Sequence, residues 1–240
     1  MFQFRHFVLP LFAMKLRDGK IPRDPRDARF VGMSFHFNDQ GLVATCSHIV
    51  KSLAEDESLV GVEMYGESLT FRLESIVEHP SYDFAVGAVA RRDYQALPIH
   101  AAPEIHIGTD VVAFGMTSSG LVDGRHTIMP RLFKGHLVRT HPAPSLPGSR
   151  STCEISFPSH NGFSGTPLVL EGRGAVAGML YGNHESTITL HKLSEFEENG
   201  RQFSEEIHRV VELGAAHTCV DIRACLADLG IKRVALDEAA

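Results

Sequence analysis

The chain has 240 residues, of which 43% are hydrophobic and 22% are charged, and its formal net charge at pH 7 is −6. This composition is typical of a globular protein with a sizeable buried core. The mildly acidic balance, without any run of five like charges, argues against a general nucleic-acid binder, because such proteins depend on clustered Lys and Arg. No stretch approaches the ~20 apolar residues of a membrane span. We therefore expect neither nucleic acid nor membrane as a partner.

The first residues do not have the pattern of a secretion signal. Their apolar stretch, residues 7–14, contains Pro10 and runs into Lys15 and Arg17 without a small-residue cleavage site. The four cysteines form no C-x-x-C pair and are too few for a disulfide framework. We therefore expect this stretch to form the first strand and the protein to be cytoplasmic.

Strand-like runs dominate most of the chain. They are short, rich in Val, Phe, Ile and Thr, and separated by Gly, Asp, Pro or Ser. They cover residues 7–13, 30–37, 41–45, 59–65, 69–77, 83–90, 110–116, 131–139, 152–157, 166–170 and 175–182. This spacing predicts an all-β fold. Prolines interrupt the pattern between residues 96 and 108, so we expect two packed antiparallel β-barrels, one from residues 1–95 and one from residues 96–240.

Helical patterns occur only late in the chain. In residues 203–214, Phe203, Ile207, Val210 and Val211 share one helical face, and a glycine follows the expected end. We therefore expect a polar surface insertion over residues 184–213 that includes an amphipathic helix.

A closing helix is predicted over residues 221–230, with Asp221 as its N-terminal cap. Cys225 falls on the apolar face of this helix, so we expect it to be a core thiol. His217, Cys219 and Cys225 are close in sequence, but their spacing matches no standard zinc site. We expect no metal and no cofactor.

The most informative stretch is residues 162–167, which follow the pattern G-x-S-G-x-P around Ser164. An ordinary turn would also use these residue types. A serine hydroxyl becomes a useful nucleophile only when an oriented base accepts its proton. Two upstream residues fit these roles, since His48 follows a buried strand and Asp83 opens another apolar strand. The order His48, Asp83, Ser164 on an all-β background matches the triad order of chymotrypsin and differs from those of subtilisin and the α/β-hydrolases.

These segments resemble the trypsin-like (chymotrypsin-fold) serine proteases, in particular the short bacterial ones. ATCSHIV is similar to the T-A-A-H-V segment of the family, HPSYDFAV to its D-I-A-V segment, and GFSGTP to its G-x-S-G-x-P segment. The resemblance spans roughly residues 5–183, and the predicted closing helix fits the family as well. It implies that Ser164 is the nucleophile, His48 the general base and then acid, and Asp83 the group that fixes the imidazole tautomer. The N–H groups of Gly162 and Ser164 would then form the oxyanion hole.

Two departures from the family pattern concern activation and specificity. Phe163 stands where secreted digestive relatives carry an Asp that pairs with a newly cut N-terminus, so we expect no zymogen activation by that route. Pro158 stands where trypsin carries the Asp that selects Lys or Arg, so we do not expect that preference. Ser159, His160 and Asn183 are expected to line the substrate pocket, which would suit apolar, small or amide side chains. A histidine facing the pocket leaves Glu as an alternative.

The sequence thus predicts a serine endopeptidase that cleaves protein or peptide substrates through an acyl-enzyme. The alternative is a binding or scaffold protein that keeps the fold without turnover. An α/β-hydrolase esterase would need a G-x-S-x-G elbow, which is absent. Cys46 is a conceivable nucleophile, but the sequence places no second base beside it. The insertion at residues 184–213 could gate the cleft or meet a regulatory protein, or it could only cover the second barrel.

Overall fold

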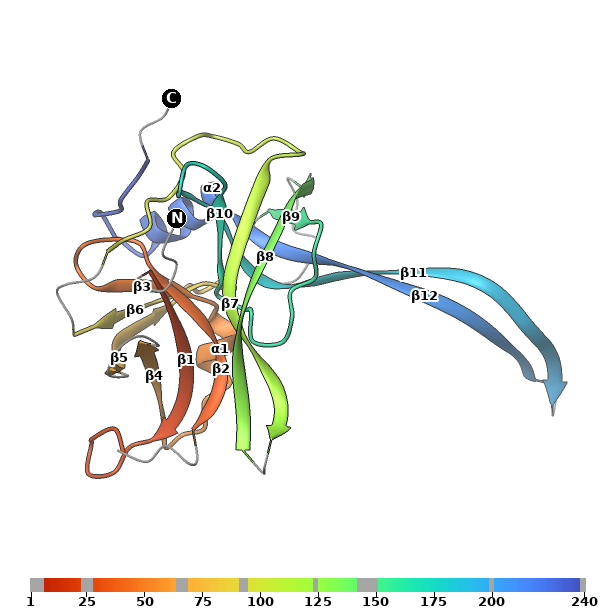
Figure 1. The fold of residues 1–240 in the computed structure, drawn as a ribbon, viewed down its shortest axis with the longest axis horizontal. Coiled ribbons are helices and arrows are strands. Elements are labelled where there is room, and N and C mark those ends of the chain that lie inside the picture. Colours follow the sequence, from red (N-terminus) through yellow and green to blue (C-terminus); the bar gives the residue numbers. More distant parts are fainter. Residues whose placement is uncertain are drawn as a thin grey trace.

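The structure is a computed structural model that describes residues 7–22, 28–63, 69–90, 95–122, 125–141, 151–198 and 201–237. Two closed antiparallel barrels make up the body of the molecule (Figure 1). The prediction of an all-β fold with two packed barrels and a C-terminal helix is confirmed.

The first barrel has the strand order β1-β2-β3-β6-β5-β4 and closes where β1 pairs with both β2 and β4. Its strands are β1 (Val8–Lys15), β2 (Arg29–His36), β3 (Leu42–Thr45), β4 (Glu57–Glu63), β5 (Leu69–Glu78) and β6 (Ala85–Val89). A single turn of helix, α1 (Ser47–Lys51), follows β3 directly.

The second barrel has the strand order β10-β11-β12-β9-β8-β7. Its strands are β7 (Asp110–Val122), β8 (Arg125–His141), β9 (Thr152–Ile155), β10 (Pro167–Leu170), β11 (Val176–Glu198) and β12 (Arg201–Thr218). The expected boundary between residues 95 and 96 falls in the segment that connects β6 to β7.

The two barrels share an apolar interface. The hydrophobic cluster that fills the first barrel also includes Met116, Val169 and Met179 of the second barrel, each of which is almost fully buried. A separate cluster fills the second barrel. Burial of apolar surface stabilises a contact by about 25 cal/mol for each Å² removed from water, so this shared cluster helps to hold the two barrels together.

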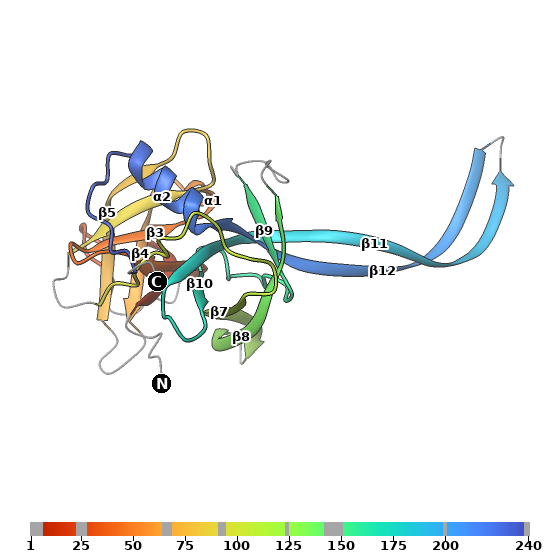
Figure 2. The same cartoon turned by 90° about the horizontal axis from the view of Figure 1, so that it is seen from above.

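Strands β11 and β12 continue far beyond the barrel as a two-stranded arm, here defined as residues 184–198 and 201–213. Their pairing runs without a third strand from His184 opposite Leu213 out to Glu198 opposite Arg201. The arm projects away from the body in both views (Figures 1 and 2). Both of its faces are in solvent, as the exposure of Ile188, Leu190 and Val210 shows.

The predicted amphipathic helix at residues 203–214 is therefore wrong, because this segment is the strand β12. The apolar residues at helical spacing do not cover the second barrel: Ile207 is 45% exposed and Val210 is 53% exposed. The side chain of Phe203 lies outside the described residues. Pairing with β11 overrides the local helical periodicity, since each residue of β12 lies opposite a residue of β11.

The closing helix α2 (Cys219–Asp228) is confirmed, but it begins earlier than predicted. Thr218 is the N-cap, and Asp221 is the third helical residue of a capping box in which each side chain accepts from the backbone of the other. The helix ends before Gly230, whose φ of +73° suits the residue after a C-cap. Neither helix of the described part of the chain has the length and apolar character to cross a membrane.

Candidate active site

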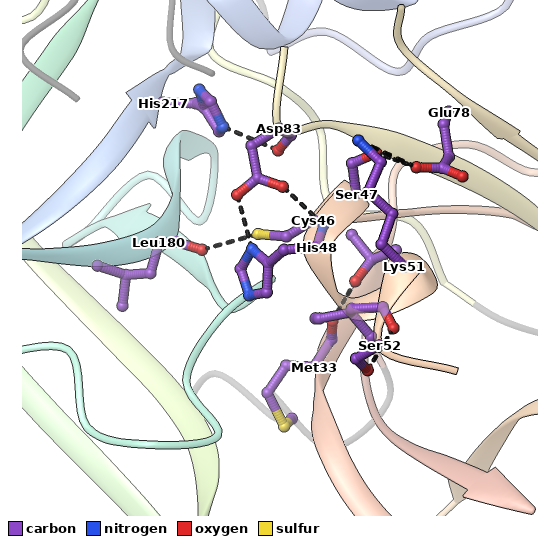
Figure 3. Close-up of polar contacts among 12 residues, drawn as sticks. Met33, Cys46, Ser47, His48, Lys51, Ser52, Glu78, Asp83, Leu180 and His217 are labelled. Carbon is purple, nitrogen blue, oxygen red and sulfur yellow. Dashed lines mark hydrogen bonds and ion pairs between the residues drawn. The ribbon is translucent and has the colours of Figure 1, made fainter. Parts of the chain in front are cut away.

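His48 and Asp83 are joined by two hydrogen bonds. His48 is in α1, and its ring Nδ1 lies 2.7 Å from Asp83 Oδ2. The backbone N–H of His48 donates to the other carboxylate oxygen, Oδ1, at 2.8 Å (Figure 3). Because one carboxylate holds both the main chain and the ring of the same residue, the imidazole has little freedom to turn. Its Nδ1 must carry a proton to face the carboxylate, which leaves Nε2 with a free lone pair when the ring is neutral.

The environment of Asp83 favours its charged form. Burial raises the pKa of the carboxyl group, but the hydrogen bonds and charge of His48 outweigh burial and hold the pKa below its usual value. The side chain of Asp83 is 16% exposed, whereas that of His48 is 47% exposed. The pair therefore has a shielded carboxylate and an imidazole that solvent or a substrate can reach.

His217 supports Asp83 from the second barrel. It is on β12, almost fully buried, and its Nε2–H donates to the backbone carbonyl of Asp83 at 3.0 Å (Figure 3). Its ring stacks on that of Tyr181 with centroids 4.5 Å apart. Burial lowers its pKa, so it is neutral at pH 7. The sequence alone suggested His217 only as an unconvincing metal ligand; its contact joins residues 134 positions apart, which no local pattern reveals.

Cys46 lies directly beside the pair. Its Sγ, a ligand nitrogen of His48 and a carboxylate oxygen of Asp83 all lie within 4.8 Å of one another. The thiol is fully buried and donates to the backbone carbonyl of Leu180 at 3.4 Å. Burial raises its pKa well above the usual value, so at neutral pH it is a protonated thiol and a poor nucleophile. The sequence placed no second base beside Cys46, whereas in the structure His48 lies next to it.

Ser164 sits in a tight turn between the barrels, and two glycines make this turn possible. Gly162 has φ +95° and Gly165 has φ +84°, values that residues with a Cβ rarely adopt. A Cβ on Gly165 would lie 2.0 Å from the carbonyl oxygen of Met33, and one on Gly162 would lie 2.3 Å from the ring of Phe30. The backbone of the turn thus approaches its neighbours more closely than any other residue type allows.

The side chain of Phe163 holds the same turn against the core of the second barrel. Its side chain is fully buried in the second barrel, edge-on to Phe133 with ring centroids 5.3 Å apart. Within the described part of the chain, the N–H groups of Gly162 and Ser164 donate no hydrogen bond, while the N–H of Phe163 donates to His160 at 2.8 Å. The two free N–H groups belong to residues on either side of a side chain that is locked into the core.

Backbone contacts bring the Ser164 turn against the segment that carries His48. The carbonyl of Ser164 accepts from the N–H of Met33 on β2 at 2.8 Å. The carbonyl of Leu180 accepts both from the N–H of Gly165 at 2.8 Å and from the thiol of Cys46 at 3.4 Å. One acceptor therefore links the residue after Ser164 to the residue two before His48. Since His48 and Asp83 come from the first barrel, the site forms only where the barrels meet.

Two hydrogen bonds, here called the clamp, join the side chain of Asn183 to the backbone of Ser159. The side-chain oxygen of Asn183 accepts from the N–H of Ser159 at 2.6 Å, and its amide nitrogen donates to the carbonyl of Ser159 at 2.9 Å. The side-chain amide of Asn183 thus bonds to the backbone N–H and carbonyl of Ser159 as the peptide group of a neighbouring strand would. Its nitrogen also lies 3.4 Å from Glu212 at the base of the arm. Ser159 is 8% exposed, so the clamp leaves little open surface between these residues.

The other two residues expected around the pocket differ in exposure. Pro158 is partly buried, whereas His160 is exposed and stacks on Phe133 with centroids 5.0 Å apart. The orientation of the His160 ring is therefore set by an aromatic neighbour on β8 and not by a partner at Asn183.

Comparison with known proteins gives the family. A model of the trypsin-like peptidase domain matches residues 32–179, which include the segments of His48, Asp83 and Ser164. No curated protein matches the chain.

Solved structures of similar fold are proteases at low sequence identity. The inactive Ser343Ala form of the Rv3671c protease from M. tuberculosis has a TM-score of 0.58 and 19% identity, over 95% of this chain and 89% of that one. The HtrA-type protease AlgWS227A with a tripeptide has a TM-score of 0.58 and 16% identity, over 95% of this chain and 61% of that one. The MamO protease domain from Magnetospirillum magneticum has a TM-score of 0.59 and 16% identity, over 92% and 95%. With the family match covering more than half of its length, the chain belongs to the trypsin-like peptidase domain family.

Proposed function

We propose that this protein is a serine endopeptidase that hydrolyses peptide bonds through Ser164, His48 and Asp83. The observation that carries the proposal is the pair of hydrogen bonds from His48 to Asp83, at 2.7 Å and 2.8 Å, near a Ser164 turn whose carbonyl accepts from Met33 of the first barrel. This pair of hydrogen bonds fixes the tautomer that general-base catalysis requires. A structural histidine would need no such orientation.

In the proposed reaction, Nε2 of His48 takes the proton of the Ser164 hydroxyl as its oxygen attacks the substrate carbonyl. The negative charge that develops on the carbonyl oxygen is stabilised by the N–H groups of Gly162 and Ser164, which find no other acceptor among the described residues. His48 then returns the proton to the leaving amine. A water molecule, deprotonated by His48 in the same way, releases the acid product and restores the serine.

We further propose that the substrate side chain next to the cleaved bond binds against the hydrogen-bonded pair of Ser159 and Asn183. The clamp between these residues supports a shallow pocket that accepts small side chains. A desolvated Lys or Arg side chain would find no carboxylate at Pro158, and an unpaired buried charge is strongly disfavoured. An amide could reach the pocket only by displacing the Asn183 side chain from its two hydrogen bonds.

A fluorophosphonate probe separates this proposal from a catalytically silent scaffold. The wild-type protein is expected to be labelled covalently and to hydrolyse casein, and Ser164→Ala to lose both activities while keeping its circular dichroism spectrum. Ser156→Ala, at an exposed serine on the same connection, is the matched control and should stay labelled. Absence of labelling in the wild-type protein, or full labelling of Ser164→Ala, would favour the scaffold.

A further inference from the structure

Cys46, His48 and Asp83 form a cluster that serine-protease chemistry alone does not require. General-base catalysis uses the imidazole and the carboxylate, but it has no role for a thiol at this place. The three ligand atoms nevertheless lie within 4.8 Å of one another, and they come from one thiol, one imidazole and one carboxylate (Figure 3). Sulfur, nitrogen and oxygen donors in one small cluster are the ligand set of zinc.

We propose that this cluster is an inhibitory zinc site, in which Cys46 Sγ, His48 Nδ1 and Asp83 Oδ2 bind the ion and a water molecule fills the fourth position. The inference concerns the regulation of the proposed active site, and its effect on hydrolysis rests on that proposed function.

The geometry needs only small movements. Zinc bonds are about 2.3 Å to sulfur and 2.0–2.2 Å to nitrogen and oxygen, so in a tetrahedron the ligand atoms lie about 3.4–3.6 Å apart. Nδ1 of His48 and Oδ2 of Asp83, now 2.7 Å apart, must separate slightly, and the sulfur, which lies within 4.8 Å of the other two ligand atoms, must come to about 3.4–3.6 Å from them. The other oxygen of Asp83 can keep its bond to the backbone N–H of His48 and hold the carboxylate in place.

An ion can reach the cluster from the side of the imidazole. The His48 side chain is 47% exposed, while the thiol behind it is fully buried. On binding, the proton of Cys46 leaves to solvent, because a coordinating thiol is deprotonated by the metal. The sulfur then gives up its weak hydrogen bond to the carbonyl of Leu180, which still accepts from the N–H of Gly165.

The chemical consequence is a change of tautomer at His48. With zinc on Nδ1, the neutral ring must carry its proton on Nε2, the atom that we propose accepts the serine proton. It can then no longer accept the proton of the Ser164 hydroxyl, and Asp83 no longer orients the ring. The bound ion thereby removes the base without blocking the substrate pocket, so we expect inhibition that acts on kcat more than on KM.

The test measures zinc binding on the inactive Ser164→Ala protein, so that its outcome does not depend on proteolysis. Competition with a zinc-chelating dye is expected to give a dissociation constant in the micromolar range or below. Adding Cys46→Ala should weaken binding at least 100-fold. Adding Cys153→Ala, which removes an equally buried free thiol elsewhere, should change it less than threefold. A titration with Co²⁺ should give a thiolate charge-transfer band that only the Cys46→Ala protein lacks.

Zinc affinity that survives Cys46→Ala, or a dissociation constant above 1 mM for the Ser164→Ala protein, would overturn the site. If Cys46→Ala does not fold, Cys46→Ser provides the same comparison, because a hydroxyl of similar size is a far weaker zinc ligand. In the active enzyme, zinc should inhibit hydrolysis and a chelator should restore it, whereas Cys46→Ala should be resistant. An enzyme that shows no hydrolysis in metal-free buffer would count against the proposed function, and the dye and cobalt measurements would still decide the zinc site.

Discussion

Replacing Asp83 by Asn tests the part of the site that the structure describes most fully. The two carboxylate oxygens have different partners: Oδ1 accepts from the backbone N–H of His48, and Oδ2 faces its ring Nδ1. The backbone donor cannot move or change its protonation. The new amide should therefore turn its oxygen toward that N–H and its NH₂ group toward Nδ1. Nδ1 must then become an acceptor, and Nε2, which should receive the serine proton, becomes protonated instead.

The cost of restoring the productive tautomer can be worked out from these contacts. The amide would have to flip, which leaves the N–H of His48 facing an NH₂ group and both donors without acceptors. Each shielded donor left unpaired costs about 1–3 kcal/mol, or about 2–6 kcal/mol for the two. The lost carboxylate charge adds to this, because it stabilises the imidazolium that forms during the reaction. At 1.36 kcal/mol for each factor of ten, kcat should fall by about 10³–10⁴.

The assay is steady-state hydrolysis of a peptide substrate, with a thermal melt to show that the variant is folded. Asp56→Asn is the matched control: Asp56 also pairs with one basic side chain, but it is 60% exposed and its partner is Lys15 and not His48, so the kcat of this variant should stay within threefold of wild type. If Asp83→Asn keeps kcat within threefold of wild type, then the tautomer argument fails and another group orients His48.

Three further changes probe the pocket, the turn and the buried histidine. Asn183→Gly removes the clamp on Ser159, so kcat/KM for substrates with Leu at the cleavage site should rise at least tenfold relative to Ala; an unchanged ratio would mean that the clamp does not limit the pocket. Gly165→Ala forces a Cβ against the Met33 carbonyl at positive φ, so it should lower the free energy of unfolding by about 2–5 kcal/mol in urea melts. The control Gly182→Ala has no atom near its added Cβ, and its free energy of unfolding should stay within about 0.5 kcal/mol of wild type. Burial lowers the pKa of His217 in the folded protein, so the contribution of His217 to stability is complete above about pH 6.5 and is lost as the pH falls toward the folded-state pKa. In that range the free energy of unfolding of the wild type should fall by up to 1.36 kcal/mol per pH unit more than that of His217→Gln. Parallel curves for the two proteins would contradict this sign.

The sequence predicted the barrels because their strands are short, apolar and separated by clear turn residues. It also placed His48, Asp83 and Ser164 next to the ends of such strands. The pairing of Asn183 with Ser159 and of His217 with the Asp83 carbonyl was not predictable. These contacts join residues 24 and 134 positions apart, and the second one also depends on how one barrel lies against the other.

The arm was misread because two signals compete in residues 203–214. Apolar residues recur there at helical spacing, and their strand alternation is imperfect. A local signal for the hairpin does exist, since Asn199 and Gly200 form the dipeptide that favours a two-residue turn. The strands β11 and β12 are separated in the sequence by these two residues, which lie outside the described part of the structure. Weighing this dipeptide above the helical periodicity would have predicted the strand pair.

The arm also carries most of the net negative charge of the molecule. Residues 184–213 contain seven Glu and only three Lys or Arg, so they carry a net charge of −4 out of −6 for the whole chain. The body, with the cleft, is left close to neutral, while the negative charge sits on a thin projection with water on both sides. Charges more than ~8 Å apart are largely screened at physiological ionic strength, so a cation near the tip responds to the arm and not to the cleft. The protein thus behaves as an electric dipole, and a positively charged surface will orient it arm first.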